Sequence, residues 1–381
     1  MPMGLRQRAA ALWLVLLVGL LVACGAGPAP TATTASQPAT TTTTTTARTT
    51  ADGTTTRATA TMAATTGATA TRTTATTRAT TGTATATRTG TTAAGTTART
   101  TAAQRVTTYP LTVRDDAGRS VTLARCPERI VSLAPSNTEI LYALGLGDRI
   151  AAVDQFSDFP EPARAKPKIG GVSRPSIEEI VALAPDVVMA AGITSRDTIG
   201  ALEGQGLTVV VLNPRDLPGV LENILLVGQL TDSNAEALRV RNGLDARVNA
   251  VGERLRGVAN RPRVYFEIDP EQFYTAGPNS FINDLLVRAG GANIAADAQT
   301  PFPQLSAEAI IARDPEVIVM GHDVPGATPE ALKARPGWAN ISAVRNDRVA
   351  AIDPDLTNRP GPRVVDGLEQ LARIFHPTVF R

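Results

Sequence analysis

The chain has 381 residues, of which 43% are hydrophobic, 4% aromatic and 19% charged. With only two His and two Cys, it cannot form a Cys/His zinc cluster. The net charge is +2, but residues 105–381 carry 29 basic and 34 acidic side chains. An acidic folded part is a poor partner for nucleic acid, because phosphate contacts need a basic surface. No GxxxxGK loop, HExxH, GxSxG or GxGxxG motif is present to indicate an enzyme.

Residues 1–24 are typical of an export signal. Arg6 and Arg8 precede an apolar run over residues 9–23, and these 15 residues are fewer than the roughly 20 that a membrane span needs. The run ends in Leu-Val-Ala-Cys-Gly at residues 21–25, which resembles the bacterial lipobox, in which the Cys is lipidated. We therefore expect a lipoprotein anchored by Cys24 to the cell membrane, outside the cytoplasm.

Residues 25–104 form a compositionally distinct segment. Among residues 31–100, 36 are Thr and 18 are Ala, and none is Leu, Ile, Val, Phe, Tyr or Trp. Such a segment has no apolar surface with which to offset the entropy lost on ordering. We expect a disordered linker with a reach of about 45–50 Å. Its dense Thr is typical of O-glycosylated stalks.

Residues 105–381 alternate short apolar runs with helical patterns, which predicts an α/β fold of mostly parallel sheets flanked by helices. The strands are expected at residues 129–134, 149–154, 186–191, 207–212, 262–268, 316–320 and 348–353. The helices are expected at residues 137–145, 176–184, 195–204, 217–230, 279–289, 306–313 and 362–375.

A long helix is expected between these two sets of elements, over residues 233–258. Its apolar residues, from Leu238 to Leu255, recur at helical spacing, and its length is about 35–40 Å. The sequence on either side is duplicated, since residues 176–188 and 306–318 both begin with Ser-x-Glu and reach a Pro just before a strand. We therefore predict two similar lobes, 105–232 and 259–381, joined by this helix, with a ligand cleft between the lobes.

Several stretches carry a family resemblance, namely the two Ser-x-Glu helices and residues 129–139, 157–160, 336–338 and 359–363. They resemble the substrate-binding lipoproteins of ABC importers. The likeness is to the periplasmic binding proteins for cobalamin, haem and ferric siderophores, and is closest to the cobalamin-binding branch. The resemblance implies a monomer that passes a bulky chelate to a permease and its ATPase. It also implies that no reaction is catalysed and that no protein-bound metal is needed.

The aromatic candidates for ligand contact are Phe156, Phe159 and Phe302, which lie in predicted loops rather than on periodic core faces. Phe156 and Phe159 follow a predicted strand, and ligand crevices lie at the carboxyl ends of parallel strands. A flat macrocycle would stack on such rings. The alternative is that each Phe holds its own loop to the core. Similar cobalamin-binding proteins have aromatic residues at the positions of Phe156 and Phe302.

The polar candidates lie in a loop that is expected after the strand at 348–353. The resemblance implies that this loop contacts ligand, so Asp355, Thr357 and Asn358 are expected to bind the amide groups of a corrinoid. Arg359 either pairs with a ligand carboxylate or caps local carbonyls. Arg174, in another loop, is a further candidate, with a solvated surface side chain as the alternative.

Glu178 and Glu308 occupy equivalent positions in the first turns of the duplicated helices. A Glu there interacts favourably with the helix N-terminus. The resemblance implies that the pair also docks onto arginines of the transporter, where charges of this kind set association rate and register. We interpret His322, His376 and Cys126 as structural, with ligand contact as the alternative for His322.

Three other interpretations stay open. The same fold would serve for a ferric siderophore or haem, and an anionic siderophore favours an Arg-rich cleft. An enzyme on this architecture would need Cys ligands for a metal cluster, and Cys126 alone cannot supply them. A glycosylated surface stalk with an adhesive head would account for the Thr-rich segment, but it does not require duplicated lobes.

Overall fold

The computed structural model describes residues 106–381. The export signal, the expected lipidation site Cys24 and the Thr-rich linker therefore lie outside the described residues. Within residues 106–381, no helix combines the length and the apolar character needed to cross a bilayer.

The first parallel sheet has the strand order β4-β3-β5-β6, with β3 (Ile130–Ser132), β4 (Ile150–Val153), β5 (Val187–Ala191) and β6 (Val209–Leu212). Its strands are continuous apolar runs because helices cover both faces. One face packs against α2 (Pro135–Ala143) and α5 (Leu217–Leu230), and the other against α3 (Ile177–Ala182) and α4 (Arg196–Gly204). We call the part from β1 to α5 the N-lobe.

The N-lobe begins with an antiparallel hairpin that the sequence did not predict, β1 (Leu111–Arg114) and β2 (Ser120–Leu123). The residues before it are fastened to the turn that follows α5. The backbone N–H of Thr107 donates to Asp232 Oδ1 at 2.7 Å, and the Tyr109 hydroxyl donates to the last carbonyl of α5 at 2.8 Å. The start of the described chain is thus tied to the beginning of the next helix, α6.

The second parallel sheet has the order β10-β9-β7-β8, with β7 (Arg263–Glu267), β8 (Ala292–Asn293), β9 (Val317–Met320) and β10 (Val349–Ala351). Its longer helices are α7 (Phe281–Arg288), α8 (Ala307–Arg313) and α12 (Val364–Phe375). Three short helices were not predicted: α9 (Pro329–Lys333), α10 (Ser342–Arg345) and α11 (Asp355–Asn358). Three 3₁₀ turns complete the described chain: η1 (Gly147–Arg149), η2 (Glu161–Ala165) and η3 (Trp338–Asn340). We call the part from β7 to α12 the C-lobe.

The two sheets have the same topology. If the strands of each sheet are numbered one to four in chain order, their spatial order across either sheet is two, one, three, four. All pairings within both sheets are parallel. The structure therefore confirms the predicted α/β architecture with two parallel sheets, and the sequence duplication corresponds to a repeated fold.

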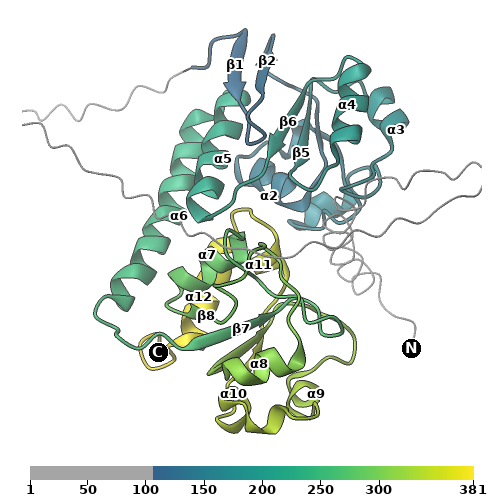
Figure 1. The fold of residues 1–381 in the computed structure, drawn as a ribbon. Helices are drawn as coiled ribbons and strands as arrows, with labels where there is room; N and C mark the ends of the chain where they lie inside the picture. Colours follow the sequence, from purple (N-terminus) through teal and green to yellow (C-terminus); the bar gives the residue numbers. More distant parts are fainter. Residues whose placement is uncertain (1–105) are drawn as a thin grey trace, which may run out of the picture. The chain divides into compact units, whose positions relative to one another are not determined.

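Helix α6 (Asn234–Leu255) connects the lobes and packs against α5 of the N-lobe and α12 of the C-lobe (Figure 1). Its 22 residues span about 33 Å at 1.5 Å per residue. The buried residues Ala237, Leu244 and Val251 recur every seven positions and belong to one hydrophobic cluster that extends into both lobes. Leu238, which the sequence placed on the buried stripe, is 46% exposed.

The duplicated Ser-x-Glu helices have matching ends. Ser176 accepts a hydrogen bond from the backbone of the third residue of α3, and Ser306 does the same in α8. Eight residues further on, Ala184 and Asp314 both have a φ of +43°. This left-handed residue ends each helix just before the following Pro and strand. The shared sequence pattern predicted both helix ends.

Candidate functional site

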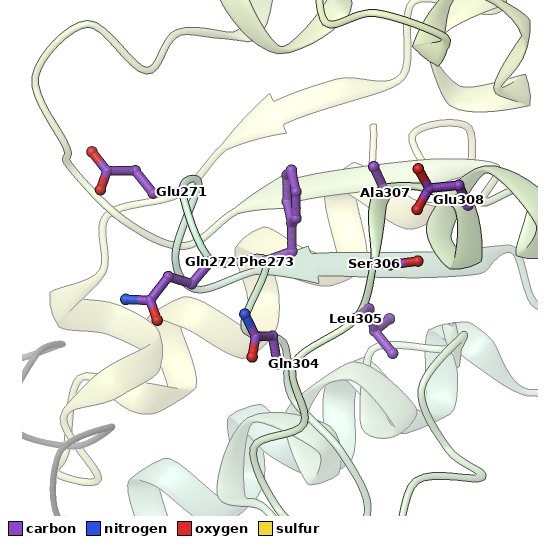
Figure 2. Close-up of a pocket in the computed structure, with 8 residues that line it drawn as sticks. All are labelled: Glu271, Gln272, Phe273, Gln304, Leu305, Ser306, Ala307 and Glu308. Atoms are coloured by element: carbon purple, nitrogen blue, oxygen red, sulfur yellow. The ribbon is translucent and has the colours of Figure 1, made fainter. Parts of the chain in front are cut away.

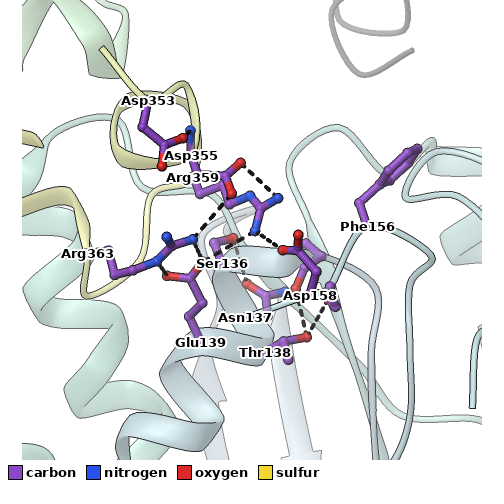
Figure 3. Close-up of polar contacts among 12 residues, drawn as sticks. Ser136, Asn137, Thr138, Glu139, Phe156, Asp158, Asp353, Asp355, Arg359 and Arg363 are labelled. Carbon is purple, nitrogen blue, oxygen red and sulfur yellow. Dashed lines mark hydrogen bonds and ion pairs between the residues drawn. The ribbon is translucent and has the colours of Figure 1, made fainter. Parts of the chain in front are cut away.

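The carboxyl edges of the two sheets face each other. In the N-lobe, β4 runs into the loop 154–160, and in the C-lobe β10 runs into residues 353–359. Arg359 Nη1 lies 2.8 Å from Asp158 Oδ1, so the two segments touch (Figure 3). Since ligands of parallel sheets bind at this edge, the junction is the candidate binding site.

Two arginines of the C-lobe form an ion-pair network there with carboxylates of both lobes (Figure 3). Arg363 donates twice to Glu139, at 3.0 and 2.7 Å. Arg359 pairs with Asp158 and with Asp355, each at 2.8 Å, and lies 3.7 Å from Glu139. The bidentate geometry fixes the Arg363 fork on Glu139. We call these five side chains the inter-lobe cluster.

Helix α2 holds Glu139 at this junction. The Asn137 side chain donates to the carbonyls of Met189 and Ala190, at 3.1 and 3.0 Å, and so fastens the first turn of α2 to the end of β5. Gly361 lies directly against this turn, where a Cβ would stand 3.3 Å from the Ser136 carbonyl oxygen and 3.4 Å from Glu139. A larger residue at 361 would hold the two lobes apart.

The N-lobe side of the junction is a rigid loop. Asp154 is fully buried and accepts from the Phe156 backbone at 2.8 Å and from the Ser157 hydroxyl. Ser157 is linked in turn to Thr138 at 2.8 Å, and Lys168 donates to the Ser157 carbonyl at 2.6 Å. Burial raises the pKa of Asp154 to about 6, although its hydrogen bonds act in the opposite direction. Burial also raises the pKa of Glu139, against the effect of Arg363.

Three of the predicted ligand residues come together at the junction: Phe159, Asp355 and Arg359. Phe159 is 43% exposed, and the Arg363 guanidinium stacks on its ring at 4.1 Å. Asp355 lies in α11, so the predicted loop at this point is in fact one helical turn.

The other predicted ligand residues are placed differently. Phe156 is 5% exposed and packs with Ala134 and Val172, so its ring holds its loop to the core, the alternative that the sequence left open. Phe302 is half-buried against the main hydrophobic cluster. Thr357 is fully buried.

Of the two remaining predicted ligand residues, Asn358 lies beside the end of β9 and Arg174 lies in a separate loop. The Asn358 side chain donates to the carbonyl of Gly321 at 3.2 Å, next to the end of β9. Arg174 is exposed in the separate loop 171–175.

Sequence reasoning missed Glu139, Asp158 and Arg363 as site residues. Glu139 and Arg363 lie in two of the stretches that carry the family resemblance, and Glu139 is the only charged residue of α2. A charged residue among the buried positions of an apolar helix was the available signal, because such a charge needs a partner.

Glu178 and Glu308 are both exposed, at the starts of α3 and α8. Each lines a surface hollow, of about 770 Å³ at Glu178 and about 580 Å³ at Glu308. Figure 2 shows the second, where Glu308 lies with Phe273 and Gln304. Hydrogen bonds from its own backbone and from the Ser306 hydroxyl lower the pKa of Glu308, so it is a carboxylate at neutral pH. Neither hollow includes a predicted ligand residue.

The residues interpreted as structural have partners inside the protein. His322 is 8% exposed and lies 3.0 Å from Glu267, which also binds Arg335. His376 ends α12 and contacts the Gly290 carbonyl at 3.2 Å.

The thiol of Cys126 donates to the carbonyl of Thr231 at 3.3 Å. In residues 106–381, no three His, Cys, Asp or Glu side chains gather where they could hold a metal ion.

Comparison with known proteins assigns the family. The model of the family "Periplasmic binding protein" matches residues 130–356. An uncharacterized ABC transporter substrate-binding lipoprotein of Bacillus subtilis is 33% identical over 274 residues, covering 70% of this chain and 86% of the relative. A cobalamin-binding protein of Halobacterium salinarum is 34% identical over 273 residues, covering 69% and 73%.

Solved structures agree with this assignment. The apo form of a periplasmic haem-binding protein from Roseiflexus sp. RS-1 superposes with a TM-score of 0.60 at 30% identity, covering 66% of this chain and 99% of that chain. The chain therefore belongs to the periplasmic binding protein family and is a solute-binding protein.

Proposed function

We propose that this protein captures a corrinoid outside the cytoplasm and delivers it to the permease and ATPase of an ABC importer. It is tethered through lipidated Cys24, has no resident metal and catalyses no reaction. The observation that carries the proposal is the junction of the two carboxyl edges, where the exposed Phe159 ring lies against Arg363 in the cluster that also contains Asp355 and Arg359. An apolar ring face suits a flat macrocycle. The neighbouring carboxylate and guanidinium suit the amide groups at its rim.

The names of the similar proteins favour a corrinoid over other chelates as the ligand. The Halobacterium salinarum relative is named a cobalamin-binding protein. A haem is the second candidate, because the Roseiflexus protein of similar fold and 30% identity is named for haem. Both are flat macrocycles, but haem carries two carboxylates and cyanocobalamin carries amides.

Calorimetric titration of the purified protein with cyanocobalamin, haemin and a ferric siderophore tests the proposal. We expect micromolar or tighter binding of cyanocobalamin, with Phe159→Ala weakening it. If haemin or the siderophore binds more tightly, that compound class is the ligand instead of the corrinoid, and the solute-binding role is unchanged. Binding of none of the three would refute the corrinoid and point to a different solute.

We also propose that Glu178 and Glu308 dock the loaded protein onto the permease. Two exposed carboxylates at equivalent positions of two similar lobes match a partner that presents basic residues twice. Ligand uptake in cells with Glu178→Arg and Glu308→Arg should fall, while the affinity of the purified variants for ligand stays unchanged. Glu330→Arg is the matched control, because Glu330 is also exposed in the first turn of a short capped helix but lines neither hollow. If neither docking variant lowers uptake, the docking role of Glu178 and Glu308 is refuted.

A further inference from the structure

The inter-lobe cluster has more acid than base. Its two guanidiniums, Arg359 and Arg363, face three carboxylates, Glu139, Asp158 and Asp355. The five groups therefore leave one negative charge when all are ionised. Arg164 lies 3.8 Å from Asp158, but it also pairs with Glu161 at 2.9 Å, so these two further residues add no net charge. Arg359 is already held by Asp158 of the N-lobe and Asp355 of the C-lobe, each at 2.8 Å, and Arg363 by Glu139 of the N-lobe, at 2.7 and 3.0 Å.

The carboxylates are also the more accessible partners. The side chains of Asp158 and Asp355 are 31% and 30% exposed, whereas those of Arg359 and Arg363 are 14% and 16% exposed. A ligand that reaches this junction meets carboxylate oxygens first. Carboxylate oxygens accept hydrogen bonds from N–H groups and repel other carboxylates.

A carboxylate on the ligand would have to displace one of the existing partners. The displaced Asp or Glu would then remain near the interface without its guanidinium, which is costly for a partly buried charge. A primary amide avoids this cost, because its NH₂ donates to an exposed Asp oxygen and its carbonyl accepts from a remaining guanidinium N–H.

We infer that the inter-lobe cluster sets the charge class of the ligand: it admits a chelate with an uncharged, amide-bearing rim and rejects the same chelate when it carries carboxylates. This inference rests on the proposed solute-binding role at the junction. Asp158 is the specificity-determining residue, since its side chain is partly exposed, lies on the N-lobe and holds Arg359 across the interface. Asp158→Asn frees one arm of Arg359 and removes the excess negative charge.

The test compares two ligands that differ in one group. Cyanocobalamin and a monocarboxylate made by hydrolysing one of its side-chain amides are titrated into wild type, Asp158→Asn and Asp148→Asn. Asp148→Asn is the matched control, because Asp148 is an exposed aspartate of the N-lobe that precedes β4, whereas Asp158 follows the carboxyl end of that strand. Near-ultraviolet circular dichroism verifies that all three proteins are folded alike.

We expect wild type to bind the amide form about tenfold more tightly than the carboxylate. In Asp158→Asn this ratio should fall to within about threefold, and in Asp148→Asn it should stay as in wild type. The wild-type ratio should also shrink as salt is added, because the discrimination is electrostatic. A merely structural role of Asp158 would weaken both ligands equally and leave the ratio unchanged, which would overturn the inference.

Titration with haemin, a dicarboxylate, distinguishes a failure of this inference from a failure of the corrinoid proposal. If the protein ignores corrinoids but Asp158→Asn binds haemin more tightly than wild type does, the charge selection stands and the corrinoid proposal fails. If wild type binds haemin as tightly as Asp158→Asn does, or if neither protein binds any ligand, the charge selection fails.

Discussion

Replacing Arg363 by Met tests how strongly the inter-lobe cluster holds the protein together. Met preserves the unbranched apolar stem of the side chain and removes the guanidinium. Glu139, whose side chain is 2% exposed, would keep only Arg359 as a cation, at 3.7 Å. Burial already raises the pKa of Glu139 while Arg363 opposes this effect, so the variant leaves a carboxylate without its main stabilising partner.

The cost follows from the burial of the pair. Removing one partner of a buried ion pair costs about 3–5 kcal/mol, because the other charge is left uncompensated. The lost stacking of Arg363 on Phe159 adds about 0.5–1 kcal/mol, and the partial exposure of Arg363 lets water return some of the loss. We expect Arg363→Met to lower the free energy of unfolding by about 3 kcal/mol. Adding Glu139→Gln should recover about 2 kcal/mol, because it removes the unpaired charge.

Urea denaturation followed by far-ultraviolet circular dichroism measures all four members of this double-mutant cycle. The matched control is Arg373→Met, on the same helix, where the side chain is 56% exposed and lies 3.6 Å from Glu369. That exposed pair should contribute less than about 0.5 kcal/mol. Should Arg363→Met cost no more than Arg373→Met, or should Glu139→Gln recover nothing in the double variant, the inter-lobe pair would not be the buried bridge that its geometry indicates.

Three further predictions concern single residues. Asp154 has a folded pKa of about 6, against about 3.9 when unfolded, so its contribution to stability is greatest below about pH 4 and is lost as pH rises through 6. Unfolding free energies should therefore show Asp154→Asn gaining about 3 kcal/mol on wild type between pH 4 and pH 7, and a constant difference would contradict this pKa. Phe156→Ala should cost about 3–4 kcal/mol in urea unfolding, because its ring is buried. Phe159→Ala should cost less than about 1 kcal/mol and weaken ligand binding instead, and equal stability losses would contradict these placements. Cys24→Ala should release the protein from membranes on fractionation, whereas retention would refute the lipid anchor.

The sequence predicted the buried strands well because helices cover both faces of each sheet. The run expected at 186–191 is β5 (Val187–Ala191), and that at 316–320 is β9 (Val317–Met320). The hairpin β1–β2 was missed because its short strands bury only one side, at Val113 and at Val121 and Leu123. Helix α11 has four residues, which is too short for a helical period to be recognised.

The candidate site was predicted only in part. Asp355 and Arg359 were found because they follow a strand of a parallel sheet, where ligand contacts are expected. Glu139 and Arg363 are 224 positions apart in the sequence, so no local pattern indicates that they pair. Phe156 and Phe159 have the same local signature, and tertiary packing alone decides that one is buried and the other exposed.

The attachment at the start of the described chain determines where mechanical tension would enter the protein. A pull on Thr107 from the preceding residues would be borne by its hydrogen bond to Asp232 and by the Tyr109 hydroxyl, beside the first turn of α6. Because α6 packs against both α5 and α12, that load would spread through the helical spine shared by the two lobes. The loop 154–160 and residues 353–359 are held by separate contacts. The first contacts to bear a pull on Thr107 would therefore lie outside the inter-lobe cluster.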